Sequence, residues 1–317
     1  MKKISKFVYF NLPGGLLKIY LKYLMQIIFI ALILCRASSP ICATFRDSLG
    51  REVTLDGEPT RIVSLAPNIT EILYFLGLGD RITGVTNFSY YPPEAAKKPK
   101  VGSYVNLNVE KIIDLSPDLV IGTVDGNEQG IVELLEQAGI KTYIINPRGI
   151  RQIIDAVAAI GRVCGVDQSN MSKIADLSQR VDKVLEKTRS KKRPLTFLQI
   201  NLIPIMSVNQ NTFHHDLISM AGGVNMTGDE PITYPRISIE AVIGKKPDVI
   251  IISSMERGGR YEAARQDWKQ WKSIPAVQNN RLHLIDSDLI DRPSPRIIDG
   301  LEELARIIHP EVNWEDK

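Results

Sequence analysis

The side chains best suited to bind a small molecule are aromatic residues in loops next to prolines. Phe88, Tyr90 and Tyr91 lie in one proline-stiffened loop, Tyr104 lies in the next loop, and Tyr234 directly precedes a proline in the C-terminal half. Aromatic residues in loops have less core to fill than those inside helices or strands. We therefore predict that these rings cover an apolar ligand.

Polar candidates lie together in residues 286–296, which follow the last predicted strand and are expected to form a polar loop. Asp288, Asp291 and Arg292 could hydrogen-bond the polar edge of a ligand. In open α/β sheets, ligands bind beyond the carboxyl ends of the strands, where these loops are expected. The pattern predicts a cleft with walls from both halves of the chain.

Residues for catalysis are sparse. The sequence has no nucleophile elbow and no glycine-rich phosphate loop. Zinc or manganese could use His214 or His215 with a carboxylate, but the other histidines are His283 and His309, and the N-terminal half has none. We therefore expect no enzyme activity, no catalytic residue, no metal site and no cofactor.

Composition limits the class of protein. The chain has 317 residues, 44% of them hydrophobic, and a net charge of +3, which fits a globular protein of about two domains. No basic patch with interleaved aromatic residues is present, so a nucleic-acid partner is not expected. Of the cysteines Cys35, Cys42 and Cys164, the last follows an apolar helix and is expected to be buried and inert.

Residues 1–43 have the pattern of a signal peptide. Lysines supply a basic start, and residues 24–34 form an apolar core that is short for a membrane span. Cleavage near Ala43, with Ala37 and Ser39 as alternatives, would export the mature chain to the periplasm. A lipid anchor on Cys35 or Cys42, or a retained N-terminal anchor, is the alternative.

One pattern occurs twice, in residues 106–122 and 235–252. In each copy a glutamate, Glu110 or Glu240, opens a short amphipathic helix, and a Pro-Asp pair and an apolar run follow. Proline ends the helix, and the run predicts a strand buried on both faces of a parallel sheet. Residues 70–79 and 215–224 form a second pair of similar segments, each a helix closed by glycine. The pattern is common in α/β proteins, but two pairs in the same order predict two similar lobes.

The remaining elements follow from hydrophobic periodicity and from turn residues. We predict a hairpin over residues 45–55. Further strands are predicted over residues 61–65, 81–86, 141–145, 195–200, 249–253 and 282–285. Helices are predicted over residues 69–76, 126–138, 150–163 and 297–308, and two more helices are expected, one that begins at residue 216 and one around residues 267–271. Asn68 or Thr70 is expected to cap the first of these helices.

A long helix is predicted between the two halves. Apolar residues recur every three or four positions from Met171 to Thr188, Asp167 or Ser169 can cap the start, and Pro194 stops the chain. A helix over residues 169–190 would be about 33 Å long and stiff. The predicted domains are an N-terminal α/β lobe over residues 44–166, a linking helix over 167–193 and a C-terminal α/β lobe over 194–317.

Residues 60–307 resemble the cobalamin-type periplasmic binding proteins that feed ABC importers, within a wider family that includes haem and ferric-siderophore binders. The motifs that carry the resemblance are residues 61–67, 91–93, 108–110, 117–121, 234–240 and 287–296. The resemblance implies two lobes joined by one rigid helix. A stiff helix predicts a small hinge motion, so affinity should come mainly from a preformed cleft. We expect the protein to be a monomer. The wider family leaves haem or a siderophore open as the ligand, and an exported chelatase-like enzyme is the alternative from another class.

The resemblance also implies roles for single residues. Tyr91 and Tyr104 would flank a corrin ring from one lobe, and Tyr234 would stack on it from the other. Asp288, Asp291 and Arg292 would hydrogen-bond the amide side chains of the ring. Glu110 and Glu240, at the outer tip of each lobe, would pair with arginines of the importer.

Overall fold

The computed structural model describes residues 22–26, 42–253 and 260–315. Most of the predicted signal peptide, including Cys35, lies outside the described residues. None of the helices in these ranges is long and apolar enough to cross a membrane. Both lobes belong to one compact unit, Thr44–Lys317.

The N-terminal lobe is built on a parallel sheet with the order β4-β3-β5-β6. Its strands are β3 (Ile62–Ser64), β4 (Ile82–Gly84), β5 (Leu119–Thr123) and β6 (Thr142–Ile145). Every residue of β5 and β6 is buried, as a strand covered by helices on both faces requires. The strand predicted from the first repeat is confirmed.

The C-terminal lobe has a second parallel sheet, with the order β10-β9-β7-β8. Its strands are β7 (Leu195–Gln199), β8 (Val224–Asn225), β9 (Val249–Ile252) and β10 (Leu282–Leu284). Counted along the chain, the first strand of each four-stranded sheet lies between the second and the third, and the fourth lies outside the third. The prediction of two similar lobes is therefore confirmed, although the two-residue β8 was not predicted.

The two repeated helices begin in the same way. In α3 (Val109–Asp114), the side chain of Asn108 accepts a hydrogen bond from the Lys111 backbone N–H at 2.9 Å. In α8 (Ile239–Lys245), Ser238 accepts one from the Ala241 N–H at 3.1 Å. Each cap lies two residues before the repeated glutamate, so the glutamate falls in the first turn.

The repeated Pro-Asp pair joins each helix to the sheet. The Asp118 carboxylate accepts hydrogen bonds from the backbone N–H groups of Thr60 at 2.7 Å and Arg61 at 3.2 Å, just before β3. The Asp248 carboxylate accepts one from the Leu195 N–H at 2.9 Å, at the start of β7. Each aspartate therefore fixes the neighbouring strand of its own sheet.

Glycine ends the second pair of related helices. α2 (Pro67–Phe75) and α7 (Phe213–Met220) are followed by Gly77 at φ +76° and Gly222 at φ +86°. A left-handed backbone at this position favours glycine, which confirms the predicted helix ends. Helix α7 begins three residues before the predicted start, because Thr212 caps it by accepting from a backbone N–H.

The predicted cap of α2 is wrong. The N-cap residue is Ala66, which makes no side-chain cap, and Pro67 starts the helix. Proline suits this position because its φ is already helical and the first N–H groups of a helix lack intrahelical partners. Asn68 and Thr70 are buried inside the helix, and the Thr70 hydroxyl hydrogen-bonds Ser64 at 2.8 Å instead.

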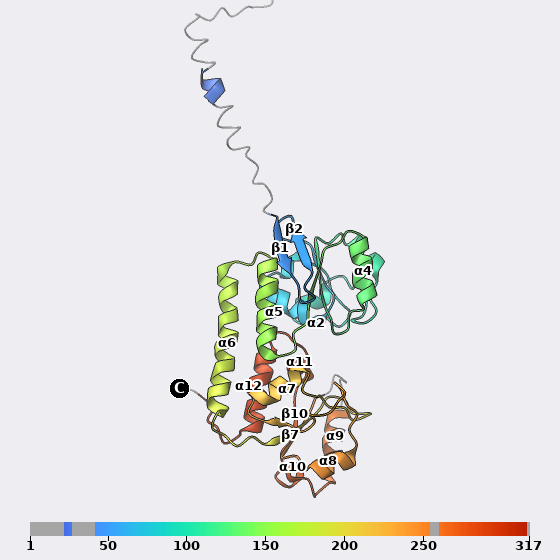
Figure 1. Cartoon of the computed structure of the whole chain (residues 1–317), viewed down its shortest axis with the longest axis vertical. Helices are drawn as coiled ribbons and strands as arrows, with labels where there is room; N and C mark the ends of the chain where they lie inside the picture. Colours follow the sequence, from blue (N-terminus) through green and yellow to red (C-terminus); the bar gives the residue numbers. More distant parts are fainter. Residues whose placement is uncertain (1–21, 27–41, 254–259, 316–317) are drawn as a thin grey trace, which may run out of the picture. The chain divides into compact units, whose positions relative to one another are not determined.

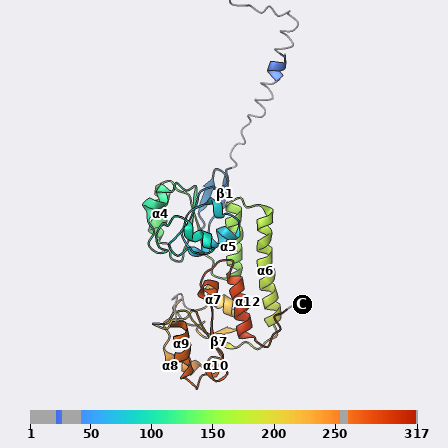
Figure 2. The ribbon, with the colours of Figure 1, turned by 180° about the vertical axis from the view of Figure 1, so that it is seen from behind.

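The linking helix α6 (Gln168–Thr188) has 21 residues and is about 32 Å long. Figures 1 and 2 show it running beside α5 (Ile150–Val163) and α12 (Ile297–Ile308), against both of which it packs. Its buried stripe, Ile174, Leu177, Val181, Val184 and Thr188, agrees with the predicted stripe. Since one buried apolar cluster includes side chains of both lobes and of α6, the helix is held along its length.

The remaining elements are short. They are β1 (Ala43–Arg46), β2 (Glu52–Leu55), α4 (Gln129–Gln137), α9 (Arg260–Lys269), α10 (Pro275–Gln278), α11 (Ser287–Ile290) and the 3-10 turns Gly79–Arg81 and Pro93–Lys97. The expectation that residues 286–296 form only a loop is wrong, because Asp286 caps α11. Cys164 is buried as predicted, and burial raises the pKa of its thiol to about 12.

Candidate functional site

A cavity of about 190 Å³ lies between the two lobes. Thr123, Asn146 and Ile200, which line it, lie at or just beyond the carboxyl ends of β5, β6 and β7. This is the position at which open α/β sheets bind ligands. We call this space the interlobe cavity.

Two of the predicted aromatic residues line the interlobe cavity from opposite lobes, Tyr104 and Tyr234. Burial is the main cause that raises the pKa of both hydroxyls, and the nearby Asp125 carboxylate raises both further. The positive charge of Arg148, which forms an ion pair with Asp125 at 2.7 Å, acts on both pKa values in the opposite direction. Both tyrosines are therefore held in the neutral, hydrogen-bonding form.

The loop that carries Tyr104 is held by Asn127. This side chain donates to the backbone carbonyls of Tyr104 at 3.1 Å and Leu65 at 3.0 Å, and accepts from the Thr123 N–H at 2.8 Å. Asn127 was expected at the start of a helix, but α4 begins two residues later. Gly126, at φ +97°, leaves room for the tyrosine ring, because a Cβ there would lie 1.9 Å from it.

Asp291 also lines the cavity, and it is tied to two other side chains. Its carboxylate bonds the His214 Nε2 at 3.0 Å and accepts from the Ser253 hydroxyl at 2.8 Å. The Asp291 and His214 side chains are each 6% exposed. His215 instead faces Asn225, whose amide nitrogen lies 3.2 Å from its ring. The two histidines therefore do not converge, and within residues 42–253 and 260–315 no group of three or more His, Cys, Asp or Glu side chains could hold a metal ion.

A second set of polar residues crosses between the lobes around Glu71 of α2, and we call it the Glu71 cluster. The Glu71 carboxylate accepts from Arg292 at 3.0 Å, from the Ser294 hydroxyl at 2.6 Å and from Arg296 at 2.9 and 2.7 Å. The Glu71 side chain is only 2% exposed. Glu71 was not predicted as a site residue, because its partners lie more than 220 residues away along the chain.

Asp288 and Arg292 belong to this cluster and do not line the interlobe cavity. The Tyr90 hydroxyl donates to Asp288 at 2.7 Å, and Arg292 pairs with Asp288 at 3.2 Å. The Arg292 guanidinium also lies over the Tyr90 ring, 4.5 Å from its centre. These groups are therefore already engaged within the protein.

Tyr91 lies outside the lining of the cavity. The peptide bond before Pro92 is cis, the Tyr91 side chain is 43% exposed, and Arg296 lies 3.8 Å above its ring. Phe88, in the same loop, is 54% exposed. Both rings present apolar surface to solvent.

Glu110 and Glu240 are exposed at equivalent positions of the two lobes. Hydrogen bonds from its own backbone N–H and from the Ser238 hydroxyl lower the pKa of Glu240. A carboxylate in the first turn of a helix is also stabilised by the helix dipole. Both side chains are therefore accessible at the surface.

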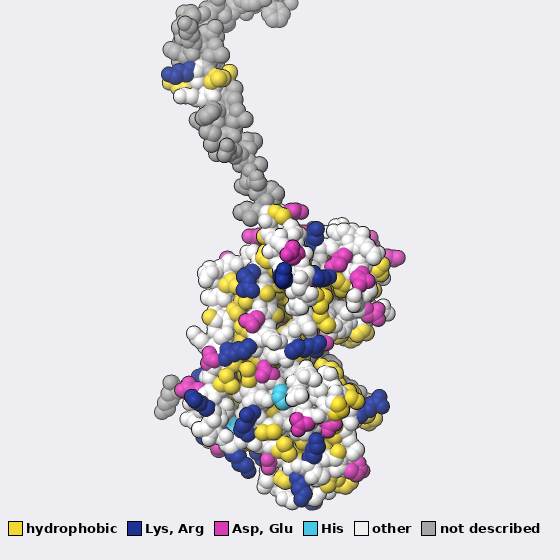
Figure 3. Space-filling view, in the orientation of Figure 1, with side chains coloured by type: hydrophobic (Ala, Val, Ile, Leu, Met, Phe, Trp, Pro, Cys, Tyr) yellow, Lys and Arg dark blue, Asp and Glu magenta, His cyan; other side chains and the backbone are white. Residues whose placement is uncertain are grey.

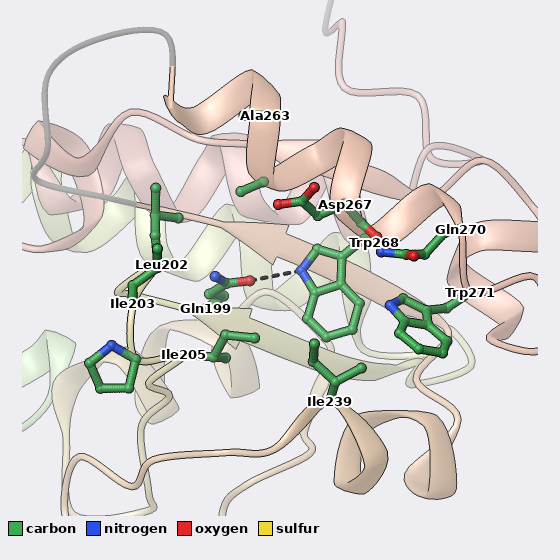
Figure 4. Close-up of a pocket in the computed structure, with 12 residues that line it drawn as sticks. Gln199, Leu202, Ile203, Ile205, Ile239, Ala263, Asp267, Trp268, Gln270 and Trp271 are labelled. Atoms are coloured by element: carbon green, nitrogen blue, oxygen red, sulfur yellow. Dashed lines mark hydrogen bonds between the residues drawn. The ribbon is translucent and has the colours of Figure 1, made fainter.

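A larger hollow, of about 660 Å³, lies within the C-terminal lobe (Figure 4). Trp268 of α9, Trp271 just beyond α9 and Ile205 are among the residues that line it. The Trp268 indole N–H donates to the Gln199 amide oxygen at 2.8 Å. This hollow draws its walls from one lobe, whereas the interlobe cavity joins side chains of both. On the face shown in Figure 3, acidic and basic side chains are interspersed rather than gathered in one patch.

Comparisons with known proteins agree with this geometry. Residues 62–289 match the family described as periplasmic binding protein. The chain is 32% identical over 246 residues to the vitamin B12-binding protein of Vibrio cholerae, covering 77% of this chain and 87% of the relative. The crystal structure of the periplasmic vitamin B12-binding protein of Vibrio cholerae matches with a TM-score of 0.72 at 31% identity, over 80% of this chain and 97% of that one. A periplasmic heme-binding protein of Pseudomonas aeruginosa, with a TM-score of 0.71 at 24% identity over 80% and 94% of the two chains, shares the fold.

Proposed function

The chain belongs to the periplasmic binding protein family, and from this premise we propose that it captures a corrinoid, cobalamin, between its lobes and delivers it to an ABC importer. The observation that carries the proposal is the cavity between the lobes, with Tyr104 on one wall and Tyr234 on the other. Flat aromatic walls can bury the apolar faces of a ring, while a few polar groups fix its edge. The vitamin B12-binding relative supports the choice of ligand.

The lobes must separate to admit such a ligand. Sites for small molecules usually measure about 300–1,000 Å³, so the cavity of about 190 Å³ is too small for a corrinoid. Polar contacts between the lobes include the Glu71 cluster and a hydrogen bond from the Ile150 N–H of α5 to Asp216 of α7 at 2.6 Å. In this proposal, the expected cleft, which is mainly preformed, must still open further to admit the ligand.

When the lobes separate, the remaining predicted residues would become able to contact the ligand. Asp288 and Arg292, released from Tyr90, would hydrogen-bond amide groups of the ring beside Asp291. Tyr91 would extend the aromatic wall from the rim of the N-terminal lobe. These assignments rest on the position of residues 288–292 at the lobe interface.

Delivery depends on the two exposed glutamates. We assign Glu110 and Glu240 as the groups that pair with arginines of the importer, because they occupy equivalent first-turn positions of the two lobes. Export by a signal peptide would bring the chain to the periplasm, where this family binds its solutes. The mature protein would act as a monomer without a cofactor and without catalysis.

Haem is the second candidate ligand, and the site disfavours it. Haem binding through a tyrosine needs the tyrosinate form, whereas burial and Asp125 raise the pKa of both Tyr104 and Tyr234. Haem also carries two carboxylates, and Asp125 and Asp291 add negative charge to the cavity lining. A neutral, amide-rich ring fits these walls better.

Calorimetric titration of the mature protein with cyanocobalamin, and with haemin alongside, tests the ligand. We expect one-to-one binding of cyanocobalamin that is weakened at least about tenfold by Tyr104→Ala and by Tyr234→Ala, since each removes a large apolar contact. Tyr91→Ala should have a smaller effect. Binding of haemin alone, with a tyrosinate spectrum, would move the ligand to haem.

Uptake by cells tests delivery. The double variant Glu110→Gln/Glu240→Gln should bind cyanocobalamin normally but fail to support its uptake, because docking loses both charges. Glu133→Gln, a change at another exposed glutamate of the N-terminal lobe, is the control. Normal uptake with the double variant would show that these glutamates do not dock.

A further inference from the structure

The buried imidazole of His214 has one nitrogen that no described residue satisfies. Its Nε2 lies 3.0 Å from the Asp291 carboxylate. A carboxylate only accepts hydrogen bonds, so Nε2 carries the proton, and Nδ1 of the neutral ring is then an acceptor. That Nδ1 is buried and has no hydrogen-bond partner among the residues that the structure describes.

The ring is held in this orientation from several sides. The Phe213 ring stacks on it at 4.1 Å with an angle of 25° between the planes. Asp291 is itself fixed by the Ser253 hydroxyl at 2.8 Å. A flip of the imidazole would break the bond to Asp291. Buried acceptors are nearly always satisfied, so this one calls for a donor that the described residues do not supply.

The surroundings of His214 disfavour an anionic ligand. The ring belongs to the lining of the interlobe cavity, together with the carboxylates of Asp125 and Asp291. Arg148 pairs with Asp125 at 2.7 Å and offsets part of that charge, but no basic side chain lines the cavity among the described residues. A ligand carboxylate would meet like charge and a lone pair, whereas a carboxamide N–H would meet acceptors.

We propose that His214 Nδ1 accepts a hydrogen bond from a carboxamide N–H of the bound ligand, and that this contact selects amide-bearing rings over carboxylate-bearing ones. The proposal rests on the proposed function and names the residue that sets its specificity. An analogue with a carboxylate in place of that amide has no proton to donate at neutral pH. Sites built to meet a ligand donor reject analogues that lack it, because the buried partner is left unpaired.

The test uses two ligand types and a matched pair of variants at about pH 8, where imidazole is neutral in water. The ligands are cyanocobalamin and its monocarboxylic acids, each with one propionamide hydrolysed. His214→Gln can keep a donor to Asp291 but loses the acceptor at the Nδ1 position. His214→Asn can keep an acceptor near the Nδ1 position but loses the bond to Asp291.

The wild-type protein should bind cyanocobalamin at least about tenfold more tightly than one of the acids. His214→Gln should bind cyanocobalamin about tenfold more weakly and lose that preference, while His214→Asn should retain it. Equal affinity of the wild-type protein for the amide and every acid would overturn the inference without any variant.

The inference would also be overturned if the two variants exchanged their expected behaviour. Normal selectivity in His214→Gln with weak binding in His214→Asn would mean that the histidine only positions Asp291, or that water satisfies Nδ1. The proposed function fails separately, if the wild-type protein does not bind cyanocobalamin at all. Thermal unfolding of each variant checks that the fold is intact.

Discussion

Replacing Glu71 with glutamine should destabilise the protein strongly, because it removes the charge that joins the lobes. Its carboxylate is 2% exposed and accepts four hydrogen bonds, three of them from Arg292 and Arg296. These arginine side chains are only 13% and 17% exposed, so water replaces the lost partner poorly. Glutamine keeps the size of the side chain but offers the arginines one neutral oxygen.

The magnitude follows from the cost of breaking a buried pair. Removing one partner of such a pair typically costs about 3–5 kcal/mol, because the other charge remains buried. The residual exposure of both arginines lets them turn partly toward solvent, so we expect the lower end, about 3 kcal/mol. If the free energy of unfolding falls by about 3 kcal/mol per molar urea, the unfolding midpoint of Glu71→Gln should lie about 1 M below that of the wild-type protein.

Urea unfolding followed by tryptophan fluorescence and circular dichroism measures this change. Glu58→Gln is the control, since it removes an exposed partner of Arg81 at 3.1 Å with 61% of the glutamate side chain accessible. Exposed pairs contribute at most about 1 kcal/mol. If Glu71→Gln costs no more than this control, the two arginines do not depend on the carboxylate and the reasoning is wrong.

Three further predictions concern the two hollows. Gly126→Ala should lower stability by about 1–3 kcal/mol and weaken cyanocobalamin binding, because φ is +97° and the new Cβ would lie 1.9 Å from the Tyr104 ring. Gly130→Ala is the control. A Cβ at Gly130 would have no neighbouring atom within 4 Å, so this change should not lower stability or weaken binding. Tyr104 and Tyr234 have pKa values raised above the usual 10, so the folded state keeps protons that the unfolded state loses. Stability should therefore fall as the pH rises above about 10, and urea midpoints that stay constant from about pH 9 to 11 would contradict this. Trp268→Phe should cost about 1–3 kcal/mol in urea unfolding, since it removes the indole N–H that donates at 2.8 Å to a buried amide oxygen.

The elements that local patterns define were predictable from the sequence. The periodicity of apolar residues gave the bounds of α5 and α12, and it placed α6 within two residues at its ends. The repeat gave the buried strands β5 and β9. Two errors arose where a few residues compete: Pro67 displaced the expected cap of α2, and Asp286 made a helix of four residues inside a polar stretch.

The site was predictable only in part, because it depends on how the lobes meet. Residue type and position after strands identified Tyr104, Tyr234 and Asp291, which do line one cavity. Nothing local distinguishes Glu71 from any other glutamate in a helix. His214 was considered as a metal ligand, but its pairing with Asp291 joins residues 77 positions apart.

The linking helix α6, which joins the two lobes, has a consequence for docking. Because α6 is packed along its length against α5 and α12, it should limit how far the two tips move apart when the lobes separate. Under the proposed docking of Glu110 and Glu240, the second contact becomes an intramolecular event with a high effective concentration once one tip has docked. A stiff helix keeps the two tips within a narrow range of separations. An importer with a different spacing would therefore engage one tip at a time. The length of α6 would then act as a ruler that matches the binding protein to its importer.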